Sequence, residues 1–159
     1  MPKIVDHDKR RSDLLDHAFS LFADNGYHGV SVRQIAKSVG MTTGMLYHYF
    51  PSKPELFTSL LNQMQARQIL DFETSLKEQS DGNVALALFI QQERKALQNL
   101  LSIAIDFRRV HPEIDISDIL DPYETVICTA MNVPPAVGRQ MLSSILGELT
   151  RGLLGATIS

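Results

Sequence analysis

The residues from Thr42 to Lys53 combine side chains that can form hydrogen bonds to phosphate and to base edges. They comprise two hydroxyls, a glycine, two tyrosines flanking a histidine, and a lysine one turn beyond, namely Thr42, Thr43, Gly44, Tyr47, His48, Tyr49 and Lys53. Hydroxyls and backbone amides at a helix N-terminus bind phosphate well, and a glycine lets the backbone approach a ligand closely. Because Met45, Leu46 and Phe50 can face inward, the segment is expected to present a polar face to nucleic acid.

Two preceding helices are expected to position this face. Apolar residues recur at three and four residues after Asp8, which can cap a first helix ending near residue 24, before Asn25-Gly26. Ser31 and Gln34 have the spacing of a capping box and predict the start of a short second helix.

A third short helix is predicted after Gly40, with Thr42 as its N-cap and its end near Phe50. Two short helices joined by a tight, glycine-containing turn and stacked on a longer one form a helix-turn-helix, which presents its second helix to the DNA major groove. The alternative for Tyr47 and Tyr49 is that their rings pack against the first helix. For Tyr49, the motif as a whole favours contact with DNA.

The rest of the chain also has helical periodicity, so the predicted fold class is all-α. Further helices are expected at about residues 54–79, 83–110, 119–131 and 135–158. The segment 83–110 is apolar on more than one face, as expected for one helix, or two abutting helices, buried between others. The expected domains are residues 1–53, which contain the helix-turn-helix, and residues 54–159, with the helix from about residue 54 bridging them.

The stretch SVRQIAKSVGMTTGMLYHYFPSKPELF, residues 31–57, resembles the DNA-binding domain of the TetR/AcrR family of bacterial transcriptional regulators. The resemblance covers about residues 8–62 and includes Gly26-Tyr27 after the first helix. It implies contacts to DNA from the recognition helix, from a lysine that holds a phosphate, and from the start of the second helix: Thr42, Thr43, Gly44, Tyr47, His48, Tyr49, Lys53, Ser31 and Arg33. The helix tip offers no Lys or Arg for bidentate reading of guanine, so specificity is expected to use Arg33, hydroxyls and DNA shape.

The resemblance further implies a C-terminal domain with a ligand pocket and a dimer interface, for which residues 63–159 must serve both tasks. Apolar candidates for an effector pocket are Met64, Phe72, Phe89, Phe107, Tyr123 and Met131. These side chains can equally form the core. A last-helix stripe is the candidate dimer interface, with packing on its own chain as the alternative: Gly138, Met141, Leu142, Ile145, Leu149, Gly152, Leu153 and Ala156.

Charge divides unevenly along a chain whose formal net charge is -3. Residues 1–53 hold seven Lys and Arg against five Asp, net +2, and the remainder holds eight basic against thirteen acidic residues, net -5. The asymmetry fits a DNA-binding N-terminal part, although an ordinary solvated surface gives the same pattern.

Several functional classes are excluded by what the sequence lacks. Cys128 is the single cysteine, which rules out an intramolecular disulfide and a cysteine-rich zinc site. No apolar run approaches the roughly 18 residues of a membrane span, so a cytoplasmic protein at the bacterial nucleoid is expected. No nucleotide loop, triad or nucleophile elbow occurs, so neither an enzyme nor a cofactor is expected.

Two features bear on a metal site, and neither predicts one. His48 has no ligand cluster around it, so a DNA contact is the better interpretation. An acidic connector can bind a hard cation in principle, but its spacing favours a solvated segment: His111, Glu113, Asp115, Asp118 and Asp121.

The sequence therefore predicts a ligand-responsive repressor that binds a near-palindromic operator as a homodimer. A helical interaction or dimerisation partner without operator binding is the alternative. The helix from about residue 54 is the candidate lever between effector and DNA, the alternative being a mere connection between independent domains.

Overall fold

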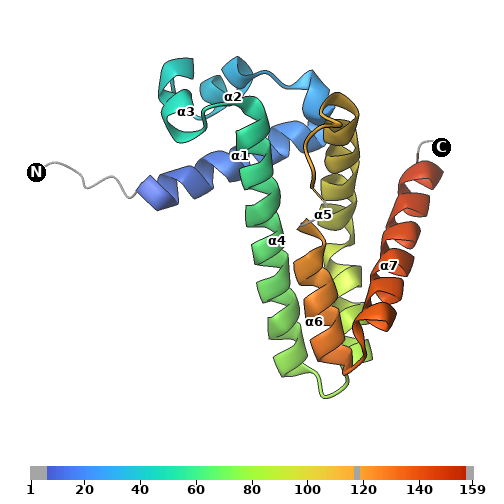
Figure 1. The fold of residues 1–159 in the computed structure, drawn as a ribbon. Helices are drawn as coiled ribbons and strands as arrows, with labels where there is room; N and C mark the ends of the chain where they lie inside the picture. Colours follow the sequence, from blue (N-terminus) through green and yellow to red (C-terminus); the bar gives the residue numbers. More distant parts are fainter. Residues whose placement is uncertain (1–6, 117–118, 157–159) are drawn as a thin grey trace, which may run out of the picture. The chain divides into compact units, whose positions relative to one another are not determined.

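The structure is a computed structural model that describes residues 7–116 and 119–156 of the 159-residue chain, with side chains up to residue 152. Its elements are α1 (His7–Gly29), α2 (Val32–Ser38), α3 (Thr43–Tyr49), α4 (Lys53–Glu78), α5 (Gly82–Val110), α6 (Asp121–Met131) and α7 (Pro135–Ala156) (Figure 1). No strand occurs among the described residues, which confirms the all-α prediction. Within those residues, no helix has the length and apolar character needed to cross a membrane.

The chain forms two compact units. The first runs to Gln63 and also takes in Ile103–His111, so that it contains α1, α2, α3, the start of α4 and the last turns of α5. The second comprises Met64–Ser102 and the chain from Pro112, and therefore contains the remainder of α4 and α5 together with α6 and α7. Both long helices thus contribute residues to both units. The expected boundary between residues 53 and 54 stays a prediction.

Side-chain caps set the N-termini of the short helices as predicted. The Ser31 hydroxyl accepts from the Gln34 amide at 3.2 Å, and the Gln34 side chain accepts from the Ser31 amide at 2.7 Å, which confirms the capping box. Thr42 caps α3 by accepting from the Met45 amide at 3.2 Å. These bonds satisfy amides that have no partner within their own helix.

The first helix extends further than predicted. Helical geometry resumes after Gly26, whose φ of 71° and ψ of 166° interrupt α1, and continues to Gly29. A positive φ is accessible to glycine at little cost, so Gly26 kinks the helix where the sequence predicts a stop. The turn from Gly26 to Gly29 then leads into Ser31 and α2.

Aromatic rings form the core of the first unit. Phe57 stands edge-on to Phe22 at 5.3 Å between centroids and stacks on Phe107 at 4.5 Å. Tyr27 packs edge-on against Phe57 and Phe107, at 4.9 Å each. All four rings are buried, and such pairs add to the stability that burial provides. The end of α5 is therefore part of the same core as α1 and α4.

The second unit has a smaller buried cluster, formed by Phe72, Ala85 and Phe89, with the two rings 5.2 Å apart. Partly buried apolar residues surround it: Leu76, Leu86, Ile90, Leu97, Val126, Ala130 and Met131. The segment 82–110 forms one helix, α5, and not two. Ile105 and Val110 on α5 are more than a third exposed, so the helix is less completely buried than its apolar content predicts.

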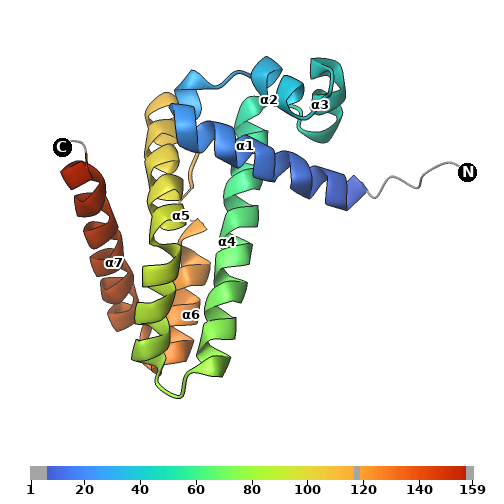
Figure 2. The ribbon, with the colours of Figure 1, turned by 180° about the vertical axis from the view of Figure 1, so that it is seen from behind.

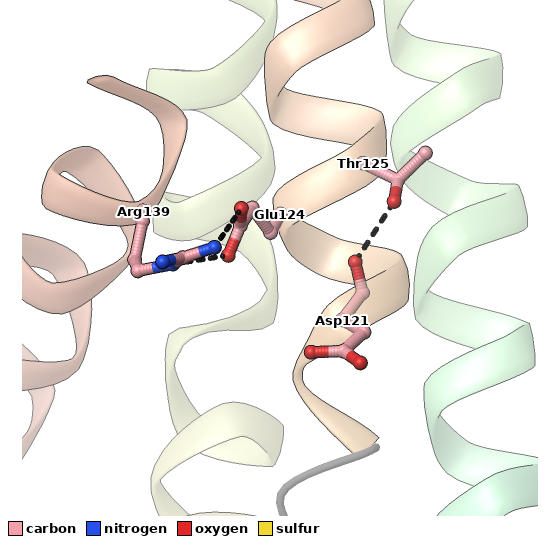
Figure 3. A network of polar contacts seen from close by, with 4 residues as sticks. All are labelled: Asp121, Glu124, Thr125 and Arg139. Atoms are coloured by element: carbon pink, nitrogen blue, oxygen red, sulfur yellow. Dashed lines mark hydrogen bonds and ion pairs between the residues drawn. The ribbon is translucent and has the colours of Figure 1, made fainter. Parts of the chain in front are cut away.

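The last two helices, α6 and α7, are consecutive and pack against each other (Figure 1). α6 starts at Asp121, later than predicted, with Pro122 in its first turn. Arg139 on α7 forms two 3.0 Å hydrogen bonds to the Glu124 carboxylate on α6, with the guanidinium directed at both oxygens (Figure 3). Thr125 donates to the Asp121 carbonyl within α6 at 3.0 Å. The predicted end of α7 near Ile158 lies outside the described residues.

Candidate nucleic-acid interface

The helix-turn-helix consists of α2 and α3, which pack on each other, while α2 also packs on α1 (Figure 2). Ile35 and Ala36 anchor α2, and Leu46 anchors α3 with no exposed surface. Phe50, at the end of α3, lies one turn after Leu46 on the same face and is also buried. Burial of this face leaves the opposite face of α3 to solvent.

Most of the predicted DNA-contacting residues lie on exposed surface. Exposed members of the set are Ser31, Arg33, Thr42, Gly44, Tyr47 and His48. Thr43, Tyr49 and Lys53 are partly buried. Met45 is 42% exposed, so the prediction that it faces inward is wrong. Its neighbour Leu46 occupies the core-facing position, and successive residues of an α-helix point about 100° apart.

The two tyrosines of α3 have different surroundings. Tyr47 is 45% exposed, and a phenol in that position is available to a ligand. The ring of Tyr49 lies 6.1 Å from that of His7 on α1, so part of its surface packs against the first helix. Contact with DNA stays a prediction for both residues.

One cationic contact near the interface was not found from the sequence. Arg11 on α1 lies over the Phe50 ring, 4.9 Å from its centroid, and donates a 3.0 Å hydrogen bond to Ser59 on α4. It links α1 to the end of α3 and to α4. No local motif marks it, because its partners lie far along the chain.

Lys53 makes several contacts inside the first unit. Its ammonium donates to the Tyr27 carbonyl at 2.6 Å and lies 4.0 Å from the centroid of the Tyr27 ring. Burial lowers the pKa of Lys53, and the nearby negative charge of Asp106 opposes that shift. The phosphate contact expected of Lys53 stays a prediction.

The candidate pocket residues do not all lie in one unit. Phe107 belongs to the core of the first unit, whereas Met64, Phe72, Phe89 and Tyr123 belong to the second. Tyr123 donates to the buried side chain of Gln68, and burial raises the pKa of the Tyr123 phenol. The sixth candidate, Met131, is partly buried at the edge of the Phe72–Phe89 cluster. A role in binding an effector stays a prediction for all six.

Part of the stripe on α7 is used within the chain. Leu149 is 2% exposed and its carbonyl accepts from Gln98 on α5, while Gly138 is buried against Cys128 on α6. Met141, Leu142 and Ile145 are only partly buried. The side chain of Leu153 lies outside those described. Within the described part of the chain, no group of three His, Cys, Asp or Glu is placed to hold a metal ion; Asp118 is outside it.

These features define an all-α protein of the helix-turn-helix class. Residues 14–60 match the family model described as bacterial regulatory proteins, tetR family. The chain is 30% identical over 120 residues to the fatty acid metabolism regulator protein of Bacillus subtilis (strain 168), covering 72% of this chain and 62% of that protein. It is 39% identical over 79 residues to the HTH-type transcriptional repressor KstR2 of Mycolicibacterium smegmatis, covering 46% of this chain and 38% of that one.

The same fold occurs in the crystal structure of the transcriptional regulator FadR from Bacillus subtilis in complex with stearoyl-CoA. The TM-score is 0.73 at 24% identity, over 91% of this chain and 87% of that one. The matches to the two curated relatives span less than two thirds of the length of each. Residues 14–60 therefore form a DNA-binding domain of the TetR type, which confirms the resemblance seen in residues 31–57.

Proposed function

We propose that this protein is a transcriptional repressor that binds operator DNA as a homodimer through α3 and responds to a small-molecule effector. The exposed polar face of α3 carries the proposal. Thr42, Tyr47 and His48 are exposed while Leu46 and Phe50 fix the opposite face in the core. Arg33 and Ser31, exposed at the start of α2, supply contacts to the flanking phosphates.

Selection from a random duplex library, followed by fluorescence anisotropy titration, tests DNA binding without knowledge of the operator. We expect selected duplexes to contain inverted half-sites separated by about one helical turn or a multiple of it, because a two-fold dimer presents two recognition helices. Arg33→Met should lower the slope of log affinity against log salt by about one unit. Lys77→Met, at an exposed lysine in the last turn of α4, is the control. Failure to select any duplex would favour a helical interaction partner.

The partly buried side chains on α7 support the dimer. Met141, Leu142 and Ile145 keep accessible apolar surface although the same helix buries Leu149 in its own chain. Ile145→Glu is expected to give a monomer in sedimentation velocity with unchanged helix content, because an isologous interface places the introduced charge near its own copy. Gln140→Glu, exposed on the other side of α7, is the matched control. A dimer that survives Ile145→Glu would place the interface elsewhere.

Fatty acyl-CoA is the effector class that we propose to test first. The fatty acid metabolism regulator is a 30% identical relative, and the similar FadR structure contains stearoyl-CoA. The partly buried apolar residues packed around Phe72 and Phe89, such as Leu76 and Ile90, offer surface to a long acyl chain. Stearoyl-CoA should weaken binding to the selected duplex, whereas free CoA and stearate serve as controls. Thermal stabilisation without a change in DNA affinity would rule out regulation by this ligand.

A further inference from the structure

The peptide group that joins Tyr27 to His28 is held at both of its ends by charged side chains. Its carbonyl oxygen accepts from the Lys53 ammonium at 2.6 Å. Its N–H donates to Oδ2 of Asp106 at 2.9 Å. A peptide dipole has its negative end at the oxygen and its positive end at the N–H, so a cation and an anion in these positions both stabilise one orientation of the group.

The backbone at this turn needs such partners because the α1 helix is interrupted there. Gly26 has a φ of 71° and breaks the regular pattern of bonds before Tyr27 and His28. A Cβ at Gly26 would lie 3.1 Å from Oδ2 of Asp106, so the same glycine also gives the carboxylate room to reach the His28 amide.

The two charged residues come from different helices of the first unit. Lys53 is the first residue of α4, and Asp106 lies in the last turns of α5. Further contacts fix the same turn: the Tyr27 hydroxyl is hydrogen-bonded to Nε2 of His111 at 3.0 Å, and its ring packs on Phe107. The turn leads directly into Ser31, the N-cap of α2. The orientation of the turn therefore determines the direction in which α2, the first helix of the helix-turn-helix, starts.

We propose that Lys53 and Asp106 are a pair of positioning residues that clamp the Tyr27–His28 peptide and thereby fix the helix-turn-helix for operator recognition. On this proposal the Lys53 ammonium stays bound to the Tyr27 carbonyl and does not contact a DNA phosphate. Partial burial lowers the pKa of Lys53, in agreement with an ammonium that lies against the Tyr27 carbonyl and ring. The part that concerns DNA rests on the proposed function, and the clamp itself does not.

Hydrogen exchange measures the clamp without DNA. His28 is an exposed residue whose amide the clamp protects. In NMR exchange experiments the His28 amide should exchange about tenfold faster in Asp106→Ala than in wild type, because a bond to a carboxylate is lost. Asp106→Asn keeps an acceptor oxygen and should retain most of the protection. Equal exchange in wild type and Asp106→Ala would overturn the clamp.

Salt titration on the selected duplex distinguishes a positioning role for Lys53 from a phosphate contact. Lys53→Met keeps the aliphatic length but removes the charge. The clamp predicts about tenfold weaker binding to the selected duplex, unchanged binding to an unrelated duplex and an unchanged salt slope. A phosphate contact predicts equal weakening on both duplexes and a slope reduced by about one unit, as for Arg33→Met, and would overturn the DNA part of the proposal.

The variants also cover the case in which Lys53→Met fails to fold. Asp106→Ala leaves Lys53 in place and should still weaken binding to the selected duplex with an unchanged slope, and unweakened binding would contradict the positioning role. If wild-type protein binds no selected duplex, the proposed function fails while the exchange of the His28 amide still decides the clamp.

Discussion

The two units differ in how completely their aromatic cores are buried. In the first unit, four rings contact one another and are almost completely buried: Phe22, Tyr27, Phe57 and Phe107. In the second unit, the apolar side chains around Phe72 and Phe89 remain partly accessible to solvent. The first unit therefore has a fully buried aromatic core, as is needed to hold α3 in one geometry. The second unit retains partly accessible apolar surface, which supports the proposed effector site and dimer interface.

The largest expected loss of stability comes from a substitution in the aromatic core of the first unit. Phe57→Ala removes a fully buried ring that packs on three others and should reduce the free energy of unfolding by about 3–5 kcal/mol in urea titrations. Leu142→Ala, at a partly buried position on α7, is the comparison and should cost far less. Equal losses would contradict the difference in packing between the units.

The next effect tests the close packing of α6 and α7. A Cβ at Gly138 would collide with Sγ of Cys128, so Gly138→Ala should destabilise the protein by about 1–3 kcal/mol. Gly147→Ala, at a glycine where an added Cβ would meet no atom within 4 Å, should instead stabilise α7 by up to about 1 kcal/mol. The double variant with Cys128→Ala should recover most of the loss, and no recovery would mean that the collision is not the cause.

A third prediction concerns the stability of the protein at alkaline pH and the phenol of Tyr123, which donates to Gln68 in the second unit. Burial holds the pKa of Tyr123 above its ordinary value of 10.0, so above that pH the unfolded chain releases a proton that the folded chain keeps. The free energy of unfolding must therefore fall as pH rises. Between neutral pH and pH 11 the stability advantage of wild type over Tyr123→Phe should shrink by about 1.4 kcal/mol. A constant difference over this range would show that the phenol titrates normally.

The smallest expected effect is at the Arg139–Glu124 ion pair between α6 and α7. The two hydrogen bonds are well formed, but the Arg139 side chain is 70% exposed. Exposed pairs are screened by water and salt, so Arg139→Ala should change the unfolding midpoint slightly at low salt and not at all near 1 M salt. A large, salt-independent loss would show that this pair is a main determinant of α6–α7 packing.

Local signals in the sequence were sufficient for most of the helix-turn-helix. The capping box of Ser31 and Gln34 and the cap at Thr42 involve residues three positions apart, and both are confirmed. At Gly26 the sequence predicted a helix stop, whereas the structure has a kink, which the positive φ accessible to glycine allows. Met45 shows the limit, because periodicity over seven residues places a face only approximately.

The contacts around the Tyr27 turn could not be predicted from the sequence. Lys53 lies 26 residues from its carbonyl partner, and Asp106 and His111 lie 78 and 84 residues from theirs. Nothing in a helical pattern specifies such distant pairs. The sequence also could not show that Phe107 lies apart from the other pocket candidates. α5 belongs to the second unit up to residue 102 and to the first unit from residue 103, and its apolar pattern does not mark this change.

The place of Ile103–His111 in the first unit has a consequence for synthesis on the ribosome. During synthesis, α1, α2 and α3 leave the exit tunnel long before Phe107 does. Until then, Tyr27 and Phe57 lack the ring that packs on both of them in the folded protein. A nascent chain stopped at Gln63 should therefore be protease-sensitive, and one extended past His111 should become resistant once α5 closes the core.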